Sequence, residues 1–212
     1  MVKKMKIKKI LALALSLSLL GIAGCSTQKA EEPVKIAIKL TDGRQMTGEL
    51  YPDVAPISVE NFVNLIEQDF FDGLIFHRVI SGFMIQGGGY DETFYEGNFN
   101  SKETTPIKGE FTSNGVKNDL KHTRGVLSMA RTQDPDSGSS QFFIMHEDSP
   151  HLDGDYAAFG KITEGLEVVD AIANAETTML EGTVLYQGMN YPQQMTDIPK
   201  EPIVIETIDI IE

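Results

Sequence analysis

Short strand-like segments separated by turns, with only two helical patterns among them, limit most strongly how this chain can fold. β-Strands are predicted where apolar residues alternate with polar ones or form β-branched runs, at 34–40, 45–50, 74–80, 125–130, 141–145, 157–162 and 202–211. Amphipathic helices are predicted at 58–69, with Ser58 as the N-cap, and around 166–173. Because strands and helices do not alternate regularly, the chain is predicted to be mainly β, an antiparallel barrel or sandwich with helices at its ends.

Two segments lack a clear strand or helix pattern. Residues 87–118 are rich in Gly, Asn, Thr and Glu, which is typical of a long surface loop region. Residues 177–201 contain Gly182, Gly188 and two prolines and are predicted to be irregular. We expect tolerated surface variation in the second segment rather than a functional element.

Residues 1–24 have the pattern of a secretory signal peptide. A lysine-rich segment is followed by an apolar run at 10–20 and by small residues. That run is shorter than the roughly 20 residues needed to span a bilayer, so a permanent transmembrane helix is the weaker interpretation. Residues 20–25 (LGIAGC) resemble the bacterial lipobox, whose cysteine is acylated and begins the mature protein. The alternative is an ordinary secreted protein with a cysteine near its cleavage site.

These patterns divide the chain into a lipoprotein signal peptide at 1–24, a polar tether at 25–33 and one globular domain at 34–212. We expect the protein to be anchored through lipid on Cys25 to the extracytoplasmic face of the cell membrane.

The chain outside the signal peptide is strongly acidic. The formal net charge is −13, and without the five lysines of residues 1–24 there remain 13 basic against 31 acidic side chains, a charge of −18. Such a body is repelled by nucleic-acid phosphates and by anionic lipid headgroups. The sequence therefore predicts no nucleic-acid partner, and membrane attachment must come from the acyl chains.

Cysteine and histidine usage argues against a disulfide and against a metal site. Cys25 is the only cysteine, so no internal disulfide can form. The four histidines show no HExxH grouping, and we expect neither a metal nor another cofactor. No GxSxG motif is present for a serine hydrolase, and the glycines at 87–89 lack the spacing of nucleotide-binding motifs.

Arg78 is the residue that most needs a functional explanation. It lies in an otherwise apolar strand, where a guanidinium is costly unless it is paired or serves a function. Strand alternation predicts that it shares a face with Phe76 and Ile80, opposite His77. Residues 82–88 (GFMIQGG) follow, with glycines that permit close backbone approach. Taken singly, these residues could equally be core or turn residues, and Arg78 could pair with an acid.

Three ordered blocks of sequence closely resemble the cyclophilin family of peptidyl-prolyl cis–trans isomerases. The blocks are 76–88 (FHRVISGFMIQGG), 121–144, which begins with KHTRGVLSMART and ends with SSQFFI, and 149–161, which begins with SPHLDG and ends with AAFGK. The resemblance covers residues 34–212. It implies a closed eight-stranded antiparallel barrel capped by two helices. It also implies an enzyme that accelerates rotation about X–Pro bonds in secreted or surface proteins and so assists their folding.

The resemblance implies roles for particular residues. Arg78 matches the family's catalytic arginine. The matches to substrate-binding positions are the apolar pocket for the proline ring (Phe83, Met84, Phe143, Leu152), the groups that hold the substrate backbone (Gln86, Gln141) and the groove edge (Ala130, Arg131, Thr132). Two further matches carry replacements typical of the bacterial branch: His151 stands where many eukaryotic members have tryptophan, and Tyr156 where they have histidine.

The expected partners are proline-containing polypeptides, and the protein is expected to act as a monomer. The alternative is a non-catalytic chaperone or binding module, which would use the same fold to grip extended proline-containing chains. The intact set of Arg78 and its apolar and amide neighbours favours catalysis, because a pure binder has no need of an arginine at the prolyl nitrogen.

Overall fold

The computed structural model describes residues 31–102 and 104–212. The predicted signal peptide, the predicted lipidation site Cys25 and most of the predicted tether lie outside the described residues.

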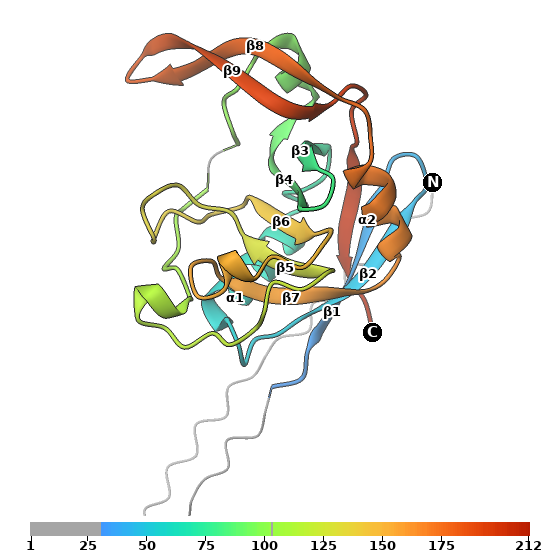
Figure 1. Cartoon of the computed structure of the whole chain (residues 1–212), viewed down its shortest axis with the longest axis vertical. Helices are drawn as coiled ribbons and strands as arrows, with labels where there is room; N and C mark the ends of the chain where they lie inside the picture. The colour runs from blue at the N-terminus through green and yellow to red at the C-terminus, as the bar shows by residue number, and fades with distance from the viewer. Residues whose placement is uncertain (1–30, 103) are drawn as a thin grey trace, which may run out of the picture.

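Eight antiparallel strands form a nearly closed barrel, which confirms the predicted fold (Figure 1). They are β1 (Val34–Leu40), β2 (Gln45–Leu50), β3 (Leu74–Ile80), β4 (Met84–Asp91), β5 (Val126–Met129), β6 (Phe142–Met145), β7 (Ala158–Glu164) and β10 (Ile205–Ile210). Their order is β10-β1-β2-β7-β5-β6-β4-β3. The two edge strands approach each other through a bridge between Ile75 and Val204, and the backbone N–H of Phe76 donates to Ile203.

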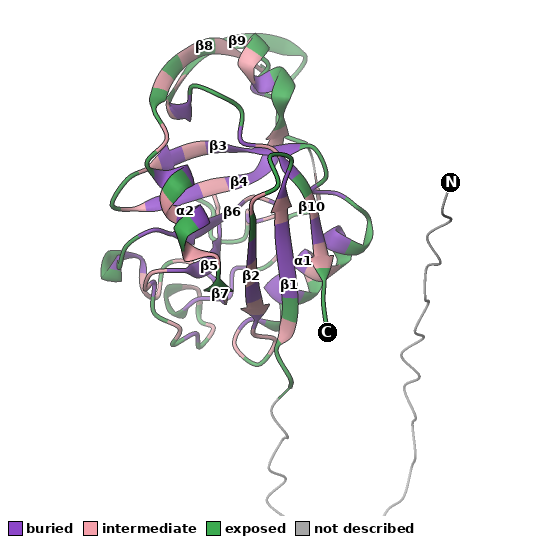
Figure 2. Ribbon diagram, turned by 90° about the vertical axis from the view of Figure 1, so that its right-hand side faces the viewer, coloured by how far each residue is buried: buried purple, intermediate pink, exposed green. Residues whose placement is uncertain are grey.

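The barrel interior is filled by large side chains that the two helices help to cover. Helices α1 (Pro56–Glu67) and α2 (Leu166–Ala173) both bury their apolar faces in the same core as the strands. Phe62 of α1 contacts the rings of Phe71, Phe142 and Phe159 at centroid distances of 4.8 to 5.3 Å. Buried residues therefore concentrate in the barrel (Figure 2). None of the helices in the described part of the chain has the length and apolar character needed to cross a membrane.

The start of α1 differs from the prediction. The helix begins at Pro56 rather than at Ser58, because proline needs no N–H partner in the first turn and its φ is preset for a helix. Ser58 is not the cap. Instead, the buried carboxylate of Glu110 accepts hydrogen bonds from the backbone N–H groups of Ile57 and Ser58 and from the Ser58 hydroxyl, at 2.7 to 3.0 Å. A side chain distant in sequence therefore caps the helix.

The segment predicted to be irregular is a long β-hairpin, so that prediction was wrong. Strands β8 (Thr177–Tyr186) and β9 (Met189–Pro199) pair along their length at the top of the molecule in Figure 1. Gln187 and Gly188 form the connecting turn with φ values of 50° and 79°. Two successive positive φ values are those of the tight turn preferred in hairpins. Glutamine is not a usual residue there, which concealed the turn in the sequence.

Residues 87–118 are less loop-like than predicted, because they contribute buried aromatic side chains. Strand β4 continues to Asp91, and two short 3-10 helices follow, η1 (Glu92–Glu96) and η2 (Thr112–Asn114). Phe94 and Phe99 form an outer aromatic cluster with Ile75 and Ile198, beside the root of the hairpin. The segment is rich in polar residues, but these few phenylalanines fix its path.

Candidate active site

Strand register aligns Arg78 with three side chains on neighbouring strands. In the antiparallel ladder Arg78 of β3 pairs with Gln86 of β4, Gln86 pairs with Phe143 of β6, and Phe143 pairs with Ser128 of β5. Residues that are directly opposite in neighbouring strands have adjacent side chains. Residues far apart in sequence therefore form one row across four strands.

This row lies outside the barrel core. Ile85 and Ile144 belong to the main core cluster, whereas their neighbours Met84 and Phe143 belong to a separate apolar cluster with Leu152. The alternation follows from the two-residue period of a strand. The cluster that contains Met84, Phe143 and Leu152, here the outer apolar cluster, is thus a second apolar layer on the outside of the barrel wall.

Arg78 does not share a face with Phe76, contrary to the prediction from simple alternation. Phe76 lies in the barrel core, as does Val79, while Arg78 lies on the outer surface. The ladder between β3 and β4 shifts register between Phe76 and Arg78, where β3 has an additional residue. Such a bulge interrupts the alternation and re-aims the side chains that follow it.

A pocket of about 180 Å³ opens on the outer apolar cluster. Its floor consists of buried side chains, among them Met84, Phe143 and Leu152. The guanidinium of Arg78 lies at the rim, where its side chain is 41% exposed. The lining contains nine residues, all of which were predicted site residues: Arg78, Phe83, Met84, Gln86, Ala130, Arg131, Phe143, Leu152 and Tyr156.

A second depression of about 150 Å³ adjoins the first and shares Gln86, Ala130 and Arg131 with it. Two further predicted residues, Thr132 and Gln141, line this depression. His151 lines neither, but its ring stacks on Phe83 with centroids 5.7 Å apart. The structure therefore brings together all the predicted substrate-binding residues along one continuous surface.

The two glutamines of the site hold each other in position. The side-chain amide of Gln86 donates to the Gln141 side-chain oxygen at 3.0 Å. Gly89 lies against Gln141, and a Cβ atom at this glycine would come within 2.6 Å of that side chain. Gly89, the residue directly after the 76–88 block, therefore provides the space that Gln141 needs.

Arg131 is held at the groove edge by several contacts. It donates to the backbone oxygens of Asp155 and Thr132, and its guanidinium lies over the rings of Tyr156 and Phe111 at 4.6 and 5.0 Å. Cation–π stacking and hydrogen bonds of this kind keep a long side chain in one orientation.

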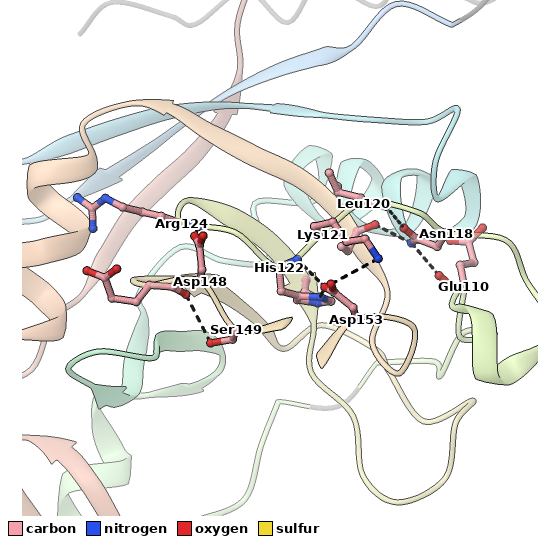
Figure 3. Close-up of polar contacts among 12 residues, drawn as sticks. Glu110, Asn118, Leu120, Lys121, His122, Arg124, Asp148, Ser149 and Asp153 are labelled. Atoms are coloured by element: carbon pink, nitrogen blue, oxygen red, sulfur yellow. Dashed lines mark hydrogen bonds and ion pairs between the residues drawn. The ribbon is translucent and has the colours of Figure 1, made fainter. Parts of the chain in front are cut away.

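A buried polar network lies beneath the pocket, and sequence reasoning missed it. The His122 ring is 3.1 Å from Asp153 through Nδ1 (Figure 3). Through Nε2 the ring is 3.1 Å from the Ser128 hydroxyl. Burial lowers the pKa of His122, although Asp153 acts in the opposite direction. The ring is parallel to Phe143, with centroids 6.0 Å apart and an interplanar angle of 19°. His122 therefore supports the ring that forms the pocket floor.

Asp197 is a further residue beside the site that the sequence did not indicate. Its carboxylate lies 3.6 Å from Nε of Arg78, and this is the only ion pair of Arg78 within the described ranges. Asp197 belongs to β9, in the segment predicted to be irregular, so no pattern in the sequence linked it to Arg78.

The chemistry of this surface is that of an apolar hollow with a cation and two amides at its rim. Such a surface suits a small apolar ring attached to a polypeptide backbone. The part of the chain that the structure describes contains no group of three or more His, Cys, Asp or Glu side chains that could hold a metal ion.

Comparison with known families agrees with this geometry. The model of the cyclophilin-type peptidyl-prolyl cis–trans isomerases matches residues 34–209. The chain therefore belongs to this family, and it is a peptidyl-prolyl cis–trans isomerase.

Individual relatives are similar over most of their length. The chain is 45% identical to a peptidyl-prolyl cis–trans isomerase of Acinetobacter baylyi over 168 residues, which cover 76% of this chain and 78% of the relative. It is 39% identical to peptidyl-prolyl cis–trans isomerase B of Escherichia coli, covering 76% and 91% of the two chains.

Solved structures that resemble this chain include that of a cyclophilin-type peptidyl-prolyl cis–trans isomerase of Cryptosporidium parvum. It has a TM-score of 0.67 and 28% identity, covering 85% of this chain and 99% of that one. A second crystal structure of the same enzyme was determined in the presence of the dipeptide Ala-Pro, with a TM-score of 0.65, 28% identity and coverage of 84% and 99%.

Proposed function

We propose that the pocket beside Arg78 receives the proline ring of a substrate and that Arg78 is the catalytic residue. The observation that carries this proposal is the position of the guanidinium at the rim of a pocket with an apolar floor. Burial of a proline ring against Met84, Phe143 and Leu152 removes apolar surface from water. The same binding step brings the prolyl nitrogen towards the rim.

The barrier to be lowered is that of the amide bond. Rotation about a peptide bond costs about 18–20 kcal/mol, because it disrupts the double-bond character of the C–N bond. For an X–Pro bond this makes spontaneous isomerisation take roughly tens to hundreds of seconds. No covalent bond is formed or broken, so the reaction requires no nucleophile.

Arg78 can favour the twisted state over both planar states. In the twisted state the lone pair is localised on the prolyl nitrogen, and a nearby N–H donor interacts with it more strongly than with a planar amide. Arginine suits this task because its charge persists at any physiological pH. Each 1.36 kcal/mol of such differential stabilisation accelerates rotation about tenfold.

The remaining site residues are proposed to hold the chain on either side of the proline. Gln86 and Gln141 offer amide groups to the substrate backbone, while Ala130, Arg131 and Thr132 form an edge along the second depression. The crystal structure of the Cryptosporidium parvum relative in the presence of the dipeptide Ala-Pro supports an X–Pro unit as the part of a substrate that this site receives. Proline-containing segments of polypeptides are therefore the proposed substrates.

The replacement Arg78→Ala tests the catalytic assignment. We expect it to reduce kcat/KM at least about tenfold, equivalent to a loss of about 1.4 kcal/mol of transition-state stabilisation. Exchange between cis and trans forms of an X–Pro peptide, followed by NMR without a coupling protease, measures the rate. Arg44→Ala is the control, because Arg44 lies in an exposed ion pair with Asp42 and not in the site. Undiminished exchange in Arg78→Ala would contradict the assignment.

The same assay distinguishes the alternative function. If the wild-type protein failed to accelerate exchange but suppressed aggregation of an unfolded protein, the non-catalytic chaperone would be the better description. Catalysis and chaperone binding require different properties of the same groove. Catalysis needs a hydrogen-bond donor at the prolyl nitrogen, whereas binding of an unfolded chain does not.

We further propose that the protein is a lipoprotein of the bacterial branch of the family. It is anchored through acylated Cys25 at the extracytoplasmic face of the cell membrane, where it assists folding of secreted or surface proteins as a monomer. The lipobox-like residues 20–25 support this location. Because the charge of −18 outside the signal peptide is repelled by anionic lipid headgroups, the acyl chains supply the affinity for the membrane.

Cell fractionation tests the anchor. We expect the wild-type protein in the membrane fraction, and Cys25→Ala in the soluble extracytoplasmic fraction or retained as an unprocessed precursor. Ser26→Ala, which leaves the cysteine in place, should fractionate as the wild type does. A wild-type protein that is soluble and carries no lipid by mass spectrometry would refute the proposal, and light scattering would determine whether it is monomeric.

A further inference from the structure

The β8–β9 hairpin is attached firmly to the barrel at its root. Leu180 and Met195 pack against the outer aromatic cluster, and Ile198 is completely buried in it. The outer edge of β8 is also paired, because the N–H of Phe99 donates to Thr183 at 3.0 Å and the N–H of Thr183 donates to Gly97 at 2.9 Å. None of these contacts involves a charged side chain.

A bulge in β9 directs Asp197 out of the hairpin. Thr178 pairs with Ile198, but the next pair is Leu180 with Met195, so Thr196 and Asp197 together oppose Met179. Asp197 adopts a left-handed backbone with φ of 61°, while the following Ile198 stays in the cluster. A bulge with a left-handed aspartate is an uncommon local conformation, and bulges often re-aim one side chain at a functional site.

The bulge places the Asp197 side chain next to Arg78. The nearest atoms are Oδ2 of Asp197 and Nε of Arg78, at 3.6 Å, which is an ion pair rather than a hydrogen bond. The side chains are 38% and 41% exposed, so solvent screens their attraction. The contribution of this pair to stability is therefore small, and its location beside the pocket suggests a different role.

We propose that Asp197 is a positioning residue for Arg78. The carboxylate attracts the guanidinium from its Nε side, which leaves the two terminal amino groups for the substrate. A long arginine side chain otherwise samples many rotamers, and each one lost on reaching the transition state slows the reaction. The inference rests on the proposed catalytic role of Arg78, and it makes the hairpin part of the catalytic apparatus.

The test uses two replacements that remove the carboxylate and keep the backbone. Asn and Gly both tolerate a left-handed conformation, so Asp197→Asn and Asp197→Gly should fold with the hairpin in place. We expect both to lower kcat/KM about fivefold, mainly through kcat. Glu181→Gln is the matched control, because Glu181 is an exposed carboxylate on β8 of the same hairpin and makes no ion pair with Arg78.

A double-mutant cycle separates positioning from a merely structural role. In the Arg78→Ala background the additional change Asp197→Asn should leave the residual kcat/KM unaltered, because the group that it positions is gone. The Nε–H resonance of Arg78 in 15N NMR should shift in Asp197→Asn and stay in place in Glu181→Gln.

The other possible results distinguish the positioning role of Asp197 from the catalytic role of Arg78. Wild-type kcat/KM in both Asp197 variants, or an equal loss with and without Arg78, would overturn the positioning role while leaving the catalytic role of Arg78 intact. Wild-type activity in the single variant Arg78→Ala would instead refute the proposed function, and the positioning role with it.

Discussion

His77 provides a sensitive test of how the outer layer of the barrel is packed. Its ring contacts Tyr90 edge-on at 4.6 Å and Phe94 at 5.9 Å, and Nδ1 has no hydrogen-bond partner among the described residues. Burial lowers the pKa of His77 from 6.5 to about 3, and the charge of Arg78 acts in the same direction. The imidazole is therefore neutral in the folded protein at pH 5 to 7.

The stability consequence follows from the difference between the folded and unfolded states. Below pH 6.5 His77 is protonated in the unfolded chain, whereas in the folded chain it is protonated only when the pH approaches about 3. Titration of His77 therefore leaves the free energy of unfolding unchanged well above pH 6.5. Below pH 6.5 it lowers the free energy of unfolding by up to about 1.4 kcal/mol per pH unit. Between pH 7 and pH 5 this loss amounts to about 2 kcal/mol.

Replacing His77 by Phe removes the titrating group and keeps an aromatic ring against Tyr90 and Phe94. Urea unfolding followed by circular dichroism at pH 7, 6 and 5 measures the free energy of unfolding of both proteins. We expect the wild type to lose about 2 kcal/mol more than His77→Phe over this range. His151→Phe, at an exposed histidine, is the control and should follow the wild type. Parallel pH dependence of wild type and His77→Phe would refute the reasoning.

Three further predictions concern the helix cap, α2 and the pocket floor. Glu110→Ala leaves two backbone N–H groups of α1 unpaired and should cost about 2 kcal/mol in urea unfolding, whereas Glu60→Ala on the exposed face of α1 should cost little. Hydrogen bonds from Arg124 hold the pKa of Asp170 of α2 below 3.8, so Asp170→Asn should lower Tm at pH 7. The difference in Tm between the two proteins should shrink below pH 3.8, because protonation of Asp170 weakens its pairing with Arg124 in the wild type. Phe143→Leu should lower kcat/KM several-fold, at least about threefold, in the X–Pro exchange assay, because the buried ring forms the pocket floor; an unchanged value would place the substrate elsewhere.

Much of the barrel could be predicted from local patterns. The alternation in β1 and the apolar run of β6 indicate strands because the side-chain period of a strand depends on the chain itself. The site motif was equally visible, since Arg78 stands out in an apolar strand. What such patterns cannot show is a register shift, so the predicted common face of Phe76 and Arg78 was wrong.

The sequence by itself determined the class of fold, the family and the residues that line the pocket, because hydrophobic periodicity and motif residues are properties of short stretches of chain. Only the tertiary structure decided that Glu110 caps α1, that residues 177–199 pair as a hairpin and that Asp197 meets Arg78. Each of these depends on groups far apart in sequence that approach one another when the barrel closes. Contacts of that kind leave no local pattern, since one partner has no periodic relation to the other.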